Sequence, residues 1–113
     1  MKPASFTLII RQGATLRYYM QFAFDCTDKT VLAQLWSRNR KTKLADFTIE
    51  WVNRVTGLFY LVLPHTITAT IVEEALWELM VIENLSQERY YYLTGPADWV
   101  PGSILPEPEP EAP

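Results

Sequence analysis

Hydrophobic and polar residues alternate with a period of two along several short segments of this chain. In residues 15–24, the odd-numbered positions from 17 onward are polar or small or carry a hydroxyl, beginning with Arg17, Tyr19 and Gln21. The even-numbered positions are all apolar or aromatic: Leu16, Tyr18, Met20, Phe22 and Phe24. Because successive side chains of a β-strand point to opposite faces, this pattern predicts an antiparallel strand with one buried face.

Further short segments rich in β-branched and aromatic residues are also predicted to be strands. They are residues 6–10, 30–37, 47–51, 58–63, 76–83 and 88–93, with a final edge strand at 97–100. In the segment 76–83, we expect Trp77, Leu79 and Val81 to face the core, because they share one parity.

Two segments allow more than one secondary structure. Residues 30–37 could be helical in part, but a strand is favoured because the segment is short and lies between turns. In residues 66–74, threonines interleave with apolar residues before Glu73 and Glu74. This pattern fits either a helical turn or a short extended crossover, and propensity does not separate the two.

Glycine and proline separate the predicted strands. Gly13 permits a bulge or tight turn, since glycine adopts positive φ without a Cβ clash. Gly57 lies in the turn before the strand at 58–63, and Pro64 ends that strand because it has no N–H to donate. Short strands at this spacing predict one small, all-β antiparallel sandwich that occupies residues 1–100.

Residues 101–113 differ sharply in composition from the rest of the chain. From Pro106 onward, proline alternates with glutamate up to Glu111. Proline fixes φ and like charges repel, so an extended polyproline II tail of about 25 Å is predicted for residues 106–113. Such a tail is either a solubilising end or an arm that lies on a neighbouring subunit.

The composition narrows the class of protein. The chain has 113 residues, 49% of them hydrophobic, which suits one domain with one core. Its net charge of -3 argues against nucleic acid as a partner, since phosphate binding needs a positive field.

Cys26 is the single cysteine, so an internal disulfide is excluded. Without a signal peptide or membrane span, we expect a soluble protein made in the cytoplasm, with no membrane contact.

The residues that could carry catalysis do not form a recognisable set. His65 is the single histidine, and no serine lies in a nucleophile-elbow sequence. A glycosidase pair among the glutamates between Glu73 and Glu83 would need a cleft that a small domain rarely encloses. The glycines are isolated, so no phosphate-binding loop is present. We therefore expect no enzymatic activity, no metal, no cofactor and no small-molecule substrate.

Basic and aromatic clusters are the candidate contact sites. The basic run at 38–43 predicts either a solvated hairpin loop or a contact with an acidic partner. In a strand, the three tyrosines at 90–92 cannot all face the core, so aromatic surface must be exposed or covered by a partner. The candidate contact residues are Arg38, Arg40, Lys41, Lys43, Tyr90, Tyr91, Tyr92, Trp99, Pro106, Pro108 and Pro110.

The order of these elements resembles small tailed-phage virion proteins and the N-terminal domains of some phage baseplate and tail-fibre proteins. The resemblance runs from Phe6 to Val100. It rests on Gln12-Gly13-Ala14-Thr15, Leu32 to Arg38, Ile49-Glu50-Trp51, Thr56 to Leu63, Thr66-Ile67-Thr68-Ala69, Trp77-Glu78-Leu79 and Tyr92-Leu93-Thr94-Gly95. The segment from Asp25 to Val31, which has no glycine, and the acidic proline tail depart from that pattern.

The resemblance implies an immunoglobulin-like β-sandwich of about seven strands that serves as a virion building block and carries no catalytic residues. We expect a tail-, baseplate- or fibre-associated adaptor in the virion, which contacts other virion proteins as a homo-oligomer or in a symmetric assembly. One alternative is a capsid decoration protein with the same fold. Another is a carbohydrate-binding module, which would need a planar row of exposed aromatic rings.

Overall fold

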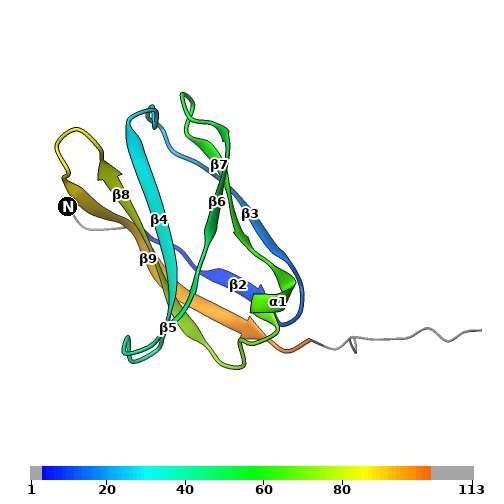
Figure 1. Ribbon diagram of the computed structural model, residues 1–113. Coiled ribbons are helices and arrows are strands. Elements are labelled where there is room, and N and C mark those ends of the chain that lie inside the picture. Colours follow the sequence, from blue (N-terminus) through cyan, green and yellow to red (C-terminus); the bar gives the residue numbers. More distant parts are fainter. Residues whose placement is uncertain (1–3, 103–113) are drawn as a thin grey trace, which may run out of the picture.

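Two β-sheets face each other across a hydrophobic core in the computed structural model, which describes residues 4–102 (Figure 1). The six-stranded large sheet consists of β1 (Ala4–Ser5), β2 (Leu8–Arg11), β9 (Arg89–Val100), β8 (Ala75–Glu83), β4 (Lys29–Ser37) and β5 (Lys43–Asp46). The three-stranded small sheet consists of β3 (Leu16–Gln21), β7 (Leu58–Leu63) and β6 (Thr48–Asn53). The predicted all-β sandwich is therefore confirmed.

The strand order matches the immunoglobulin arrangement. The small sheet has the order β3-β7-β6, which corresponds to strands B, E and D. In the large sheet, the order β9-β8-β4-β5 corresponds to strands G, F, C and C′. Both β4–β8 and β8–β9 are antiparallel pairs, as expected.

The N-terminal strands correct the expectation of a purely antiparallel sandwich. Both β1 and β2 pair with β9 in parallel, so residues 97–100 form no edge strand but the last part of the long, covered β9. Gly95 and Pro96 lie between the two strands predicted at 88–93 and 97–100, yet both belong to the continuous strand β9. They face the gap between β1 and β2, where the missing N–H of proline is not needed for pairing.

Gly95 is required where the segment around Phe6 runs close to β9. A Cβ added at Gly95 would lie 2.2 Å from the carbonyl oxygen of Phe6. That same oxygen accepts a hydrogen bond of 2.8 Å from the indole N–H of the fully buried Trp77. The glycine therefore lets the N-terminal segment approach β9 closely enough to satisfy a buried donor.

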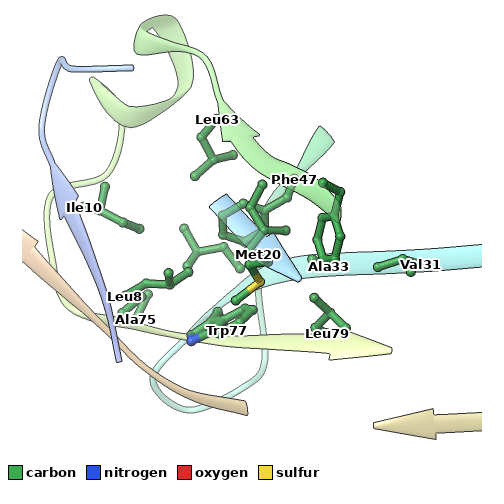
Figure 2. Close-up of a cluster of buried hydrophobic side chains, with 14 of the residues drawn as sticks. Leu8, Ile10, Met20, Val31, Ala33, Phe47, Leu63, Ala75, Trp77 and Leu79 are labelled. Carbon is green, nitrogen blue, oxygen red and sulfur yellow. The ribbon is translucent and has the colours of Figure 1, made fainter. Parts of the chain in front are cut away.

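The core forms between the inner faces of the two sheets, where every second residue is buried. As predicted, Trp77, Leu79 and Val81 of β8 are buried and face inward. Figure 2 shows side chains from both sheets meeting around Met20 and Trp77. The buried residues of β4 and β7 are Val31, Ala33, Leu35, Phe59, Leu61 and Leu63.

Three further segments can be compared with their predicted secondary structure. The strand predicted for 15–24 ends at Gln21, and the rings of Phe22 and Phe24 beyond it stack with centroids 4.8 Å apart. The segment at 30–37 is a strand, as favoured. The segment after Pro64, for which the sequence allowed a helical turn or an extended crossover, begins with a single helical turn, α1 (His65–Thr68). Irregular chain follows it.

Candidate protein-contact surfaces

The outward-facing side of the large sheet carries rows of apolar side chains, here called the outer face of the large sheet. The strand register places Leu32, Met80 and Tyr91 in one row across β4, β8 and β9. Leu32 is 45% exposed and Tyr91 51% exposed. A second row joins Trp36 and Leu76 to the exposed Pro96. Contiguous apolar patches of this kind commonly mark interaction sites.

A polar row separates the two apolar rows, and its groups are largely paired with each other or with neighbours. It consists of Gln34, Glu78 and Thr94. The Gln34 side-chain oxygen accepts a hydrogen bond of 3.1 Å from the Trp36 indole, and Arg40 forms a salt bridge with Glu78. Because these polar groups already have partners, a protein that covers this face would not bury an unpaired carboxylate.

The sequence pattern did not single out this outer face, although it contains the necessary signal. In β8, the residues that face outward are Leu76, Glu78, Met80 and Ile82, so three of four are apolar. The inner positions of β8 are apolar as well. A strand that is apolar on both faces indicates that something covers its second face.

The basic run forms an exposed turn between β4 and β5, here called the basic hairpin (residues 38–43). The Asn39 side chain organises it, because its oxygen accepts hydrogen bonds from the Ser37 hydroxyl (2.7 Å) and the Lys41 backbone N–H (2.9 Å). Arg40 adopts a positive φ of 62°. The predicted loop is therefore confirmed for residues 38–42, whereas Lys43 begins β5.

The four cations of the basic hairpin differ in their partners. Arg40 pairs with Glu78 of β8. The Lys43 ammonium lies 2.9 Å from Asp46, and this hydrogen bond lowers the pKa of the Asp46 carboxyl. Within residues 4–102, Arg38 and Lys41 form no salt bridge. Two of the predicted contact residues thus present uncompensated positive charge.

The three consecutive tyrosines lie in three different environments. Tyr91 belongs to the outer face of the large sheet. Tyr92 points toward the core, where its ring lies 5.1 Å from the ring of Phe22. Tyr90 is 38% exposed, and its hydroxyl donates a 2.9 Å hydrogen bond to Glu88, which raises the pKa of Tyr90. A register shift between Leu79 and Met80 accompanies this division.

The remaining candidates do not join the outer face. Trp99 lies opposite Ile10 and packs against the core, so its half-buried ring is not part of the outward-facing surface. Its indole nitrogen is buried and has no hydrogen-bond partner within the described part of the chain. Pro106, Pro108 and Pro110 lie outside the described residues.

The outward side of the small sheet, here called the outer face of the small sheet, has its own aromatic pair. Tyr19 is 53% exposed, and its ring lies 5.3 Å from that of Tyr60 at an interplanar angle of 56°. Arg17 sits over the Tyr60 ring at 4.4 Å and pairs with Glu50 at 2.9 Å. The tilt between the two rings does not provide the flat platform that stacking on sugar rings would use.

No cluster of three or more histidine, cysteine, aspartate or glutamate side chains suited to a metal occurs within residues 4–102. No helix of that part of the chain is long and apolar enough to cross a membrane.

The sequence matches no family model and has no significant match among the curated proteins. The surfaces themselves therefore carry the functional argument.

Proposed function

We propose that this protein is a structural protein of a phage virion, associated with the tail, baseplate or fibre, that acts through protein–protein contacts. The observation that carries the proposal is the apolar outer face of the large sheet. The resemblance between the order of sequence motifs and that of phage virion proteins supports the choice of particle.

The composition of the outer face of the large sheet suits a protein contact. The centres of protein interfaces are enriched in aromatic residues and methionine and depleted of unpaired charge. Trp36, Met80 and Tyr91 supply such residues, and the charge of Glu78 is compensated by Arg40. The immunoglobulin-like framework holds these side chains on paired strands, which limits the conformational entropy lost on binding.

Repetition would strengthen such a contact. In a symmetric particle, each copy presents the same surface to an equivalent neighbour. When several contacts form together, the overall attachment is much stronger than any one contact. A modest patch on a small domain is therefore sufficient for an adaptor.

The proposal is tested by the incorporation of variants into particles. The chain is expressed as wild type, Tyr91→Arg or Tyr19→Arg during phage assembly, and its amount in gradient-purified particles is measured by mass spectrometry. Tyr19→Arg is a matched control, because Tyr19 is exposed to nearly the same extent but lies on the small sheet.

We expect wild type and Tyr19→Arg to be present at a fixed copy number and Tyr91→Arg to be reduced at least about tenfold, as for loss of an aromatic interface anchor. Absence of the wild-type chain from particles would contradict the virion proposal. Equal incorporation of Tyr91→Arg and wild type would contradict the choice of surface.

A capsid decoration protein would use the same kind of contact at a different place. Electron microscopy of labelled particles separates the two locations, since the label lies either on the tail or on the head. A carbohydrate-binding module would instead give measurable glycan affinity that is lost in Tyr19→Ala.

A further inference from the structure

The charges of this chain are unevenly distributed. The whole chain has 13 acidic and 10 basic residues. Glu107, Glu109 and Glu111 are three of those acidic residues, and residues 103–113 contain no lysine or arginine. The rest of the chain therefore has equal numbers of acidic and basic residues. The entire net negative charge belongs to this C-terminal segment.

The basic hairpin presents the opposite charge in a compact turn. Arg38 and Lys41 have no carboxylate partner within residues 4–102, and both are exposed. Trp36 lies at the base of this turn on the outer face of the large sheet and is partly exposed. Positive charge beside an aromatic ring suits a segment that alternates glutamate with proline, because prolines pack on aromatic rings.

The described end of the chain and its own basic hairpin lie at opposite edges of the large sheet, at the end where Ala97, Ala75 and Ser37 form one row. After Val100 the chain is held at the β2 edge of the large sheet: the Val100 carbonyl accepts the Gln12 backbone N–H at 2.9 Å, and the Gly102 N–H is 3.4 Å from the Gln12 side-chain oxygen. The basic hairpin lies at the opposite, β5 edge of the same sheet. Figure 1 shows the orange end of β9 pointing to the right and the β4–β5 turn at the lower left.

We propose that residues 103–113 of one copy bind the basic hairpin of a second copy. The glutamates pair with Arg38 and Lys41, and the prolines pack against Trp36. An extended chain of this length can span about 34 Å, which is enough to reach a neighbouring copy. This contact links copies of the chain and goes beyond the proposed function, which concerns the outer face of the large sheet.

A charge-swap experiment on the full chain tests the proposal. The hairpin variant carries Arg38→Glu and Lys41→Glu, and the tail variant carries Glu107→Lys, Glu109→Lys and Glu111→Lys. Molar mass is measured by sedimentation equilibrium at low salt for each variant alone and for their equimolar mixture. Circular dichroism checks that each variant keeps the β-spectrum of the wild type.

Wild type should self-associate at low salt and dissociate in about 1 M salt, where the Debye length is about 3 Å. Each variant alone should associate at least about tenfold more weakly, because its hairpin and tail then carry the same sign. The mixture should regain association, since each tail now meets a complementary hairpin on the other variant. A control variant, Arg17→Glu on the small sheet, should associate like wild type.

Three results would overturn the proposal. One is a wild-type chain that stays monomeric at low salt, and another is a single variant that associates as tightly as wild type. The third is a mixture that remains monomeric, because a tail and a complementary hairpin on different copies would then have failed to bind. None of these results affects the incorporation test with Tyr91→Arg, so failure of this proposal is distinguishable from failure of the proposed function.

Discussion

The outer faces of the two sheets differ in how their side chains are covered. On the small sheet, Arg17 lies over the ring of Tyr60 and pairs with Glu50, so a cation covers the aromatic surface. On the large sheet, the row of Leu32, Met80 and Tyr91 carries no charged side chain. One ring of the small sheet is thus covered within the chain, although Tyr19 and Val52 remain exposed there, whereas the large sheet presents a row of apolar side chains that contains no charge.

A contact surface in a sandwich can be recognised by the arrangement of its exposed apolar residues. Both inner faces must be apolar, because together they form the core. An outer face needs apolar residues only where something other than water covers it, although single exposed apolar residues are common. Rows of apolar residues across neighbouring strands are therefore more informative than the number of exposed aromatic residues.

The largest expected change in the free energy of unfolding distinguishes a tryptophan in the core from one on the outer face of the large sheet. Trp77→Ala removes a fully buried indole, together with its hydrogen bond to Phe6, and should lower the free energy of unfolding by about 3–5 kcal/mol. Trp36→Ala removes the same side chain from the outer face, where it is partly exposed, and should have less than half that effect. Urea unfolding followed by circular dichroism measures both.

A comparable loss of stability in the two tryptophan variants would mean that Trp36 contributes to the core as much as Trp77 does. The large sheet would then have two structural faces, and its outer face would no longer stand apart from that of the small sheet.

A second, smaller effect concerns the turns at the ends of the small sheet. Gly57 has a φ of 76°, and an added Cβ would lie 2.7 Å from the Phe22 carbonyl oxygen. Gly13 has a φ of 83°, but an added Cβ would meet no atom within 4 Å. Gly13→Ala should therefore lower the free energy of unfolding by about 1–2 kcal/mol, from backbone strain alone.

Gly57→Ala should destabilise the protein further, because backbone strain and a clash with the Phe22 carbonyl act together. Thermal unfolding of the two variants gives the comparison directly, and each variant serves as the control for the other. Equal losses would show that the turn before β7 can move away from Phe22, so that the small sheet is less rigid than its register indicates.

Local periodicity was enough to predict most of the sandwich. The alternation in 15–24 correctly placed Met20 and Phe22 on the buried face, and the shared parity of Trp77, Leu79 and Val81 correctly placed these three in the core. Period-two alternation works here because one side of each strand always faces the other sheet. The loop prediction for the basic run succeeded for residues 38–42, since charged side chains are kept at the surface.

Features that depend on distant parts of the chain were not predictable in this way. The parallel pairing of β2 with β9 joins residues about 90 positions apart. Gly95 and Pro96 read as a strand end because their local propensity opposes a strand. Only the gap between β1 and β2 makes them acceptable there, and the sequence gives no local sign of that gap.

The candidate contact surfaces were predictable only in part. The sequence identified the basic hairpin and the tyrosine run, but it did not indicate that Tyr91 alone would join Leu32 and Met80 in one row. That row depends on the register of three strands, including a shift between Leu79 and Met80. Register is a tertiary property, so residue types alone did not reveal it.

The smallest expected effect concerns single side chains on the outer faces of the two sheets. The Arg17–Glu50 salt bridge is about half exposed on both sides, so a double-mutant cycle with Arg17→Met and Glu50→Gln should give a coupling of about 0.2–1 kcal/mol. This coupling should shrink in about 1 M salt because mobile ions screen exposed charges. Leu32→Thr on the large sheet should change the free energy of unfolding by less than about 0.5 kcal/mol at either salt concentration.

Urea unfolding at the two salt concentrations measures these differences, with Val52→Thr on β6 as the matched control for the leucine substitution. If Leu32→Thr destabilises the isolated protein clearly more than Val52→Thr, then Leu32 packs within the chain. The large sheet would then satisfy its own outer surface. If the two substitutions are equivalent, Leu32 contributes no more to folding than the exposed Val52 does, and the apolar row remains available to a partner.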